Sequence, residues 1–172
     1  MEGNKKIKAR PRGLLIFGAP CSGKTTFAEK FAEKFGLAYY DLDILRGKGF
    51  TRDQIVDVVT LLTKTRQTIV IEGGIETEQS RTEIRNALRS NGYDPALIWL
   101  QTDISTIKMR MKKRYRSVAK AREEYDKNIC ELEAPSEFER PIILSGKHTF
   151  ETQSKHALTG LSKLDEKNDS KR

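Results

Sequence analysis

The sequence reads GAPCSGKT from Gly18 to Thr25, and this stretch decides the fold. It fits the spacing G-x-x-x-x-G-K-[ST] at every fixed position. An apolar run at 14–17 precedes it and predicts a buried strand, while phenylalanines at 27, 31 and 35 recur at helical spacing. A strand, a glycine-rich turn and a helix N-terminus together form an anion site, because backbone N–H groups and the helix dipole converge there. The stretch therefore predicts a phosphate-binding loop.

The fixed residues of this loop have separate chemical tasks. Gly18 and Gly23 let the backbone turn closely without a Cβ clash. Lys24 can reach the β- and γ-phosphates of a nucleotide, and the Thr25 hydroxyl can bind Mg²⁺. We therefore expect ATP and Mg²⁺ as cofactors. The residues expected to bind the nucleotide are Gly18, Ala19, Pro20, Cys21, Ser22, Gly23, Lys24, Thr25 and Thr26.

Composition indicates a single domain of ordinary character. The chain has 172 residues, enough to bury a sizeable core. No apolar run approaches the ~20 residues of a membrane helix, and Cys21 and Cys130 form neither a C-x-x-C pair nor a metal cluster. We expect a cytoplasmic protein without a membrane partner. The net charge of +8 predicts anionic partners, and nucleic acid stays open beside the nucleotide.

Strand and helix patterns alternate along the chain. Strands are expected at 14–17, 37–40, 68–71, 96–100 and 141–144, and helices at 26–35, 51–65, 78–90, from 104 and at 150–163. This alternation predicts an α/β fold of three layers, in which right-handed crossovers place helices on both faces of a five-stranded parallel sheet.

Three segments depart from this alternation. Residues 1–12 form a basic arm that we expect to be mobile, and 164–172 form a tail that we expect to be disordered, which leaves a domain at 13–163. An insertion at about 115–138 is charged and weakly amphipathic. We interpret it as a short helical lid that closes over phosphates, with an inert surface helix as the alternative.

Acidic and glycine residues follow two of the expected strands. Asp41 and Asp43 come after the second strand, and Glu72, Gly73 and Gly74 after the third. Ligands gather at the carboxyl ends of parallel strands, where a carboxylate can hold Mg²⁺ through water, orient a substrate hydroxyl or accept its proton. We expect Asp41 or Asp43 to act on the acceptor, against the alternative of turn chemistry. Glu72 resembles a Walker B acid and is expected at the metal and at the substrate. Gly73 and Gly74 either form a plain turn or let the substrate approach the backbone closely.

Two arginines share one face of the helix that begins near residue 104. Arg110 and Arg114 are four residues apart. An arginine fork matches the equatorial oxygens of a transferring phosphoryl group. We expect both side chains to neutralise the charge that develops during transfer, with a solvated basic helix end as the alternative.

The order of these features resembles the small P-loop kinases: the adenylate-kinase-like, shikimate- and gluconate-kinase-like, and polynucleotide-kinase- and zeta-toxin-like enzymes. Residues 40–43 are similar to the substrate-binding segment of shikimate kinases, and 72–74 partly match their glycine triplet. The pattern that includes Arg81, Arg110 and Arg114 is more similar to kinases of nucleosides, polynucleotide ends or nucleotide sugars. The resemblance implies a P-loop NTPase fold with strand order 2-3-1-4-5, a substrate-binding role for Arg81 and contact of Gly146 with adenine.

The sequence therefore predicts a magnesium-dependent ATP phosphotransferase. Its acceptor is expected to be a small hydroxyl or phosphate compound, with a nucleoside or nucleotide favoured. Two alternatives stay open. A 5′-hydroxyl polynucleotide kinase would use the excess positive charge. A nucleotide-binding switch or partner-dependent ATPase would have no small-molecule acceptor.

Overall fold

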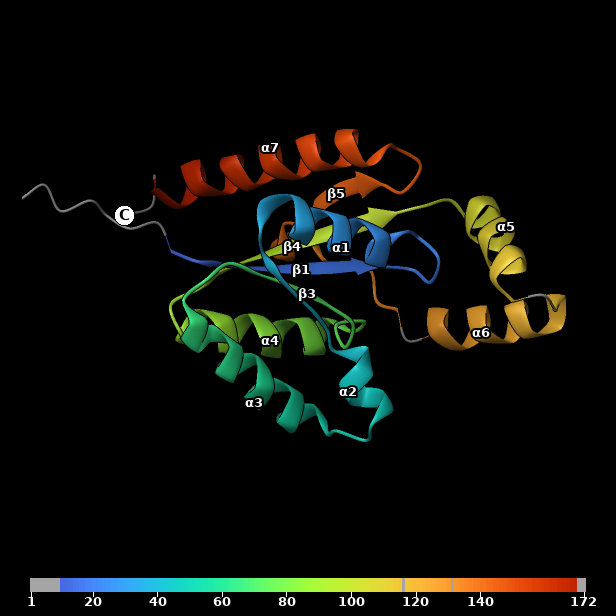
Figure 1. The fold of residues 1–172 in the computed structure, drawn as a ribbon, viewed down its shortest axis with the longest axis horizontal. Coiled ribbons are helices and arrows are strands. Elements are labelled where there is room, and N and C mark those ends of the chain that lie inside the picture. Colours follow the sequence, from blue (N-terminus) through green and yellow to red (C-terminus); the bar gives the residue numbers. More distant parts are fainter. Residues whose placement is uncertain (1–9, 116, 131, 170–172) are drawn as a thin grey trace, which may run out of the picture.

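The computed structural model describes residues 10–115, 117–130 and 132–169. Its sheet has five parallel strands in the order β2-β3-β1-β4-β5, which confirms the predicted fold and strand order (Figure 1). Strand β1 lies at the centre between β3 and β4, so the phosphate-binding loop leaves the central strand. The strands are β1 (Arg12–Gly18), β2 (Ala38–Asp41), β3 (Ile69–Glu72), β4 (Asp94–Gln101) and β5 (Ile142–Ser145).

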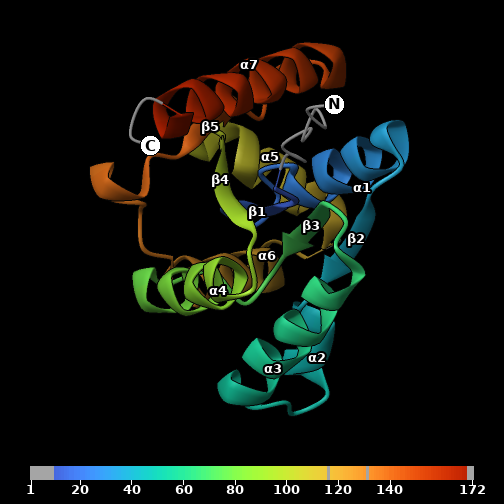
Figure 2. The same ribbon diagram turned by 90° about the vertical axis from the view of Figure 1, so that its left-hand side faces the viewer.

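Helices cover both faces of this sheet and make the three expected layers (Figures 1 and 2). Helices α1 and α7 pack on one face through Phe27, Phe31 and Ala157. Helices α3 and α4 pack on the other through Val59 and Leu88. The described helices are α1 (Lys24–Phe35), α2 (Asp43–Gly47), α3 (Arg52–Leu62), α4 (Glu78–Ser90), α5 (Ile104–Arg114), α6 (Val118–Cys130) and α7 (Phe150–Asp169), with 3₁₀ turns η1 (Thr63–Thr65) and η2 (Glu137–Glu139).

Strand β1 begins before the expected strand at 14–17. Arg12 is paired in register with Asp94 of β4, and its backbone N–H donates to Thr68 Oγ1 at 3.1 Å. Because these contacts fix the backbone, Arg12 belongs to the sheet and not to the arm predicted for 1–12. Residues 1–9 of that arm lie outside the described residues.

Helix α7 is longer than the predicted helix at 150–163. It continues to Asp169, well into the segment 164–172 that was expected to be disordered. Leu164 packs against the core beneath α1 and α7, and Asp165 accepts a hydrogen bond from Arg12. These contacts explain why the helix continues. Residues 170–172 lie outside the described residues.

The insertion predicted at about 115–138 contains α6 and most of η2. Tyr125 of α6 and Tyr115 pack against Ile107 and Met111 of α5, so the two helices contact each other. Figure 1 shows both helices at the end of the molecule where the phosphate-binding loop lies. The helix of the lid is therefore present where it was predicted, and its movement stays a prediction. None of the described helices combines the length and apolar character needed to span a membrane.

Candidate active site

The phosphate-binding loop connects β1 to α1 and depends on two glycines. Gly23 has a φ of 103°, in the left-handed region that disfavours other residues. A Cβ at Gly18 would lie 2.6 Å from the Leu100 carbonyl oxygen, so the loop can pass β4 only with glycine there. Ser22 is fully buried, and its hydroxyl has no hydrogen-bond partner among the described residues. The loop therefore has the shape that the motif predicted, with Lys24 at the first residue of α1.

Side chains from α5 and the end of β4 hold this loop from behind. Arg110 Nη1 donates to the carbonyl oxygens of Cys21 and Ser22 at 3.1 and 3.0 Å, and Arg110 Nη2 donates to the Gly146 carbonyl at 2.8 Å. Thr102 Oγ1 also donates to the Ser22 carbonyl, at 3.1 Å. The structure thus gives the Arg110 guanidinium a positioning contact with backbone, where the sequence predicted a free fork for phosphate.

A cleft of about 450 Å³ lies beside the loop and is strongly cationic. Lys24, Lys30 and Arg114 line it, and Gly146 lies on its wall next to the loop. Positive side chains at a helix N-terminus suit the phosphates of a nucleotide. The lining residues are Cys21, Gly23, Lys24, Thr25, Thr26, Phe27, Lys30, Arg110, Arg114, Gly146, His148, Phe150 and Gln153. Ala19 packs toward α5 instead, in the cluster of Ile107 and Met111.

Thr25 and Glu72 lie together at the end of β3, as expected for a metal site. Thr25 Oγ1 donates to Glu72 Oε1 at 2.5 Å, Lys24 Nζ lies 3.8 Å from the same oxygen, and Tyr39 OH donates to Oε2 at 3.2 Å. Burial raises the pKa of Glu72, although the Thr25 hydrogen bond and the Lys24 charge oppose that rise. In the described part of the chain, no group of three or more His, Cys, Asp or Glu side chains could hold a metal. A hydroxyl and a carboxylate are oxygen ligands of the kind that suits an ion which keeps water and phosphate ligands, as Mg²⁺ does.

The acidic residues after β2 have separate roles in the structure. Asp41 Oδ1 accepts a hydrogen bond from the Asp43 N–H at 2.9 Å, which is the turn chemistry considered as the alternative. Asp43 Oδ1 accepts from the Gly74 N–H at 3.1 Å, and the Asp43 side chain is 47% exposed. A Cβ at Gly73, whose φ is 78°, would lie 2.7 Å from Asp43. The glycine pair is therefore a turn that admits Asp43, and it fixes the direction of that carboxylate.

Comparison with known proteins agrees with this geometry. A family model described as an AAA domain matches residues 14–132, which is more than half of the chain. The chain belongs to this AAA-domain family. No curated protein matches the sequence.

Three solved structures similar to this AAA-domain chain are named as kinases. A gluconokinase from Sinorhizobium meliloti 1021 has a TM-score of 0.71 at 19% identity and covers 95% of this chain and 99% of its own. A sugar kinase from Janibacter sp. HTCC2649 has a TM-score of 0.67 at 23% identity, with coverages of 88% and 95%. The APS kinase of Mycobacterium tuberculosis, in complex with AMPPNP and APS, has a TM-score of 0.66 at 17% identity, with coverages of 90% and 99%. The resemblance to small P-loop kinases is thus confirmed as a likeness of fold.

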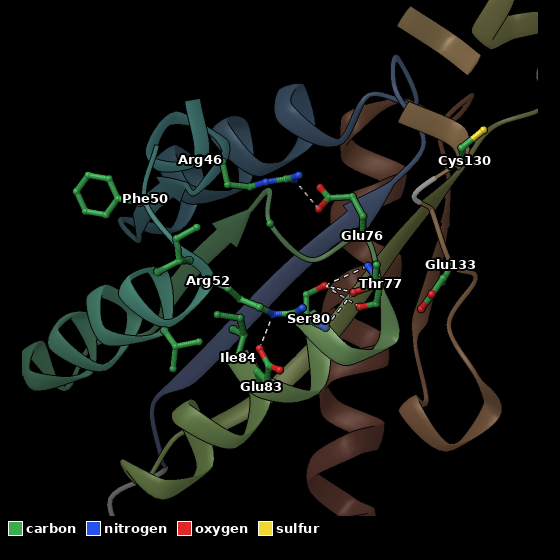
Figure 3. A pocket seen from close by; sticks show the side chains of 13 residues that line it. Arg46, Phe50, Arg52, Glu76, Thr77, Ser80, Glu83, Ile84, Cys130 and Glu133 are labelled. Carbon is green, nitrogen blue, oxygen red and sulfur yellow. Dashed lines mark hydrogen bonds and ion pairs between the residues drawn. The ribbon is translucent and has the colours of Figure 1, made fainter. Parts of the chain in front are cut away.

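The AAA-domain chain has a second cleft, of about 400 Å³, which the sequence did not reveal (Figure 3). In it Arg46 Nη1 donates to Glu76 Oε2 at 2.9 Å and lies 3.3 Å from Asp43 Oδ1. Burial, and then the nearby Asp43 charge, raise the pKa of Glu76. The lining residues are Arg46, Phe50, Arg52, Ile55, Val56, Gly74, Glu76, Thr77, Ser80, Glu83, Ile84, Cys130 and Glu133. The sequence feature that could have indicated this cleft is the carboxylate of Glu76, only two residues after Gly74.

Arg81 was expected to bind substrate, and the structure places it elsewhere. Its side chain is fully buried, and Nε and Nη2 donate to the two oxygens of Glu139 at 2.7 and 3.0 Å. Nη1 donates to the carbonyls of Glu76 and Glu133, each at 3.0 Å. The guanidinium therefore ties the loop after β3 to the segment after α6. It lines neither of the two clefts described above, which corrects the prediction.

Proposed function

We propose that this AAA-domain protein is a magnesium-dependent ATP phosphotransferase with a small hydroxyl-bearing acceptor. The observation that carries the proposal is that residues lining two different clefts make polar contacts near the end of β3. Lys24 lines the first cleft and contacts Glu72, the last residue of β3. Gly74, two residues after Glu72, lines the second cleft, and its N–H donates to Asp43. A switch or an ATPase without an acceptor has no need of a second cleft with an oriented carboxylate beside it.

The nucleotide side of this proposal uses the loop and its neighbours. The loop N–H groups and Lys24 would hold the β- and γ-phosphates. Thr25 and Glu72 would hold Mg²⁺, which supplies charge neutralisation when it is bound. Arg114, which lines the same cleft, is placed to neutralise charge on the transferred group. Gly146 and His148 line the wall where the base would lie.

The acceptor side uses Asp43 and its partners. Asp43 is half exposed, and the Gly74 N–H and Arg46 fix its direction, so it can accept a hydrogen bond from the acceptor hydroxyl and then its proton. Asp41 holds the turn that presents Asp43. Glu76 and Arg46 offer further polar groups to a substrate with several hydroxyls.

The proposed acceptor class follows from the cleft and from the neighbours. The cleft is small and lined by both charges, which suits a compact polar molecule. Two similar structures are called a gluconokinase and a sugar kinase. The nucleoside or nucleotide favoured from sequence gains no support from these names. We therefore propose a small polyhydroxy compound as the acceptor.

The test is incubation of the purified protein with ATP, Mg²⁺ and a panel of sugars, sugar acids, nucleosides, nucleotides and 5′-hydroxyl oligonucleotides. We expect a phosphorylated polyhydroxy product, identified by mass spectrometry, and expect the Asp43→Asn variant to make little of it. Asp41→Asn, next to it in the same turn, is the matched control. ATP hydrolysis at one rate whatever the panel member, with no phosphorylated product, would contradict the proposal.

A further inference from the structure

A third cleft lies at the opposite end of the sheet from the phosphate-binding loop. It has a volume of about 770 Å³ and is lined by residues at the starts of β1 and β4, by α4 and by the segment before β5. Figure 1 shows the starts of these strands at the end of the molecule remote from α5 and α6. Five arginines line this distal arginine cleft: Arg10, Arg12, Arg85, Arg89 and Arg140.

Carboxylates do not balance the charge of the distal arginine cleft. Its lining contains only three of them, Asp94, Glu137 and Glu139. Both oxygens of Glu139 accept hydrogen bonds from Arg81, which lies behind the cleft wall. In the described part of the chain, Arg89 and Arg140 take part in no ion pair. Arg10 lies 4.0 Å from Asp94, and Arg12 pairs with Asp165. The unpaired guanidinium groups of the cleft are therefore those of Arg89 and Arg140.

Arg85 adds a partly desolvated cation to this cleft. Its side chain is 13% exposed, and its nearest approach to Glu139 Oε1 is 3.7 Å. Its buried Nε has no hydrogen-bond partner among the described residues. Burial, followed by the charges of Arg89 and Arg81, lowers the pKa of Arg85. Arg85 Nη2 donates to the Glu139 carbonyl at 3.4 Å, so the guanidinium is held at the cleft wall and adds positive charge there.

The rim of the cleft carries an exposed aromatic ring. Phe138 is 94% exposed, next to Arg140, whose φ of 49° lies in the left-handed region. An arginine surface holds phosphate oxygens, and a neighbouring ring can stack on a base. The cleft therefore has groups for phosphates and, at one edge, a group for a base.

We propose that the distal arginine cleft binds a chain of phosphates, at a site separate from the ATP loop. Arg89 and Arg140 bind neighbouring phosphates through their guanidinium groups, and Arg85 adds positive charge from the cleft wall. The ligand's source is either a free polyphosphate group or the backbone of a single-stranded nucleic acid. Glu139 connects this site to the acceptor cleft, because Arg81 binds Glu139 on one side and the Glu76 carbonyl on the other.

The experiment measures binding of inorganic tripolyphosphate by calorimetry to the full chain saturated with AMPPNP and Mg²⁺. We expect one further binding event, and expect Arg89→Gln/Arg140→Gln to weaken it by about tenfold or more, because charge-assisted hydrogen bonds are lost. AMPPNP affinity should not change. Lys155→Gln, which removes an exposed cation of α7 outside the clefts, is the matched control. No binding to the saturated protein, or equal binding by the double variant and the control, would overturn the proposal.

A second arm identifies the source of the phosphates. A single-stranded deoxyoligonucleotide is titrated in parallel over a series of salt concentrations, with Phe138→Ala as the probe of stacking. If nucleic acid is the source, the oligonucleotide binds more tightly than tripolyphosphate. Phe138→Ala then weakens oligonucleotide binding and leaves tripolyphosphate binding unchanged. If a free polyphosphate group is the source, tripolyphosphate binds more tightly and Phe138→Ala changes neither. In both cases the double variant should reduce the salt dependence of oligonucleotide binding, and an unchanged dependence contradicts the proposal.

Discussion

The nucleotide half and the acceptor half of the candidate site are built in different ways. The phosphate-binding part of the nucleotide half is one continuous stretch, Gly18 to Thr25, in which two glycines and the helix N-terminus shape the backbone. The acceptor half collects side chains from α2, from the loop after β3 and from the segment after α6. Phosphate can be held by N–H groups that every residue carries, whereas a particular acceptor needs particular side chains. A short motif can therefore specify the first half and cannot specify the second.

Lys24→Ala would test the nucleotide half most severely. If Lys24 stabilises the transferring phosphoryl group, turnover should fall by about 10³-fold or more. The fold should be retained, because Lys24 is at the surface end of α1 and pairs only with Glu72 among the described residues. Steady-state rates with circular dichroism as the folding control measure this. An unchanged ATP-dependent rate would remove the loop from the mechanism.

Arg81→Met would test what holds the acceptor half together. The change leaves the buried Glu139 without its closest cation and with Arg85 only at 3.7 Å, and unfolding free energy should fall by roughly 3–5 kcal/mol. Urea denaturation measures the loss. The double variant Arg81→Met/Glu139→Gln is the control, and it should recover much of the stability because no buried charge is left. A single variant as stable as the parent would show that the ion pair does not join the two segments.

Asp43→Asn would separate the two halves. Phosphoryl transfer should fall by about 10²-fold, as expected for loss of a general base. The affinity for ATP, measured by calorimetry, should change little, because Asp43 contacts Gly74 and Arg46 and not the loop. Asp41→Asn keeps the acceptor carboxylate and should lose less transfer activity. A large loss of ATP affinity with normal transfer would reassign Asp43 to the nucleotide or its metal.

Glu72→Gln would test the residue at the boundary between the two halves through the pH dependence of stability. Because burial raises the pKa of Glu72, the folded protein binds that proton more tightly than the unfolded chain does. Its contribution to stability is therefore largest below the ordinary glutamate pKa of about 4.3 and is lost as pH rises through the raised value. The ligand-free Gln variant should show a flatter dependence of melting temperature on pH and a higher melting temperature at neutral pH. An equal dependence in both proteins would mean that Glu72 is not held in a desolvated site.

The lid gives the smallest expected effect. If residues 110–138 close over both halves, amide hydrogen exchange there should slow when a bisubstrate analogue binds, and Arg114→Ala should reduce that protection by about tenfold. Arg122→Ala, on the exposed side of α6, is the control. Exchange that is equally slow with and without ligand would identify α6 as a fixed surface helix.

The sequence predicted local and periodic features well and long-range contacts poorly. The five strands, the loop and the position of Asp43 after β2 follow from patterns that lie within a few residues of each other, whereas the strand order came from the resemblance to a family. The partner of Arg81 is 58 residues away, so its burial against Glu139 left no local trace. The sequence likewise predicted the helix face of Arg110 but not that three backbone carbonyls would lie beside it. An arginine is long enough to face either a ligand or the backbone, and only the packing of α5 decides between them.

The contacts of Arg110 have a consequence for the direction of the loop's dipoles. A trans peptide group is planar, so its C=O and N–H point in opposite directions, and the described residues contain no cis peptide bond. Arg110 and Thr102 hold the Ser22 carbonyl from behind. The N–H of the same peptide group, which belongs to Gly23, is thereby turned away from them. A fixed positive charge behind the loop thus sets the polarity in front of it. An arginine that need not touch phosphate still determines which end of a peptide dipole faces the phosphate.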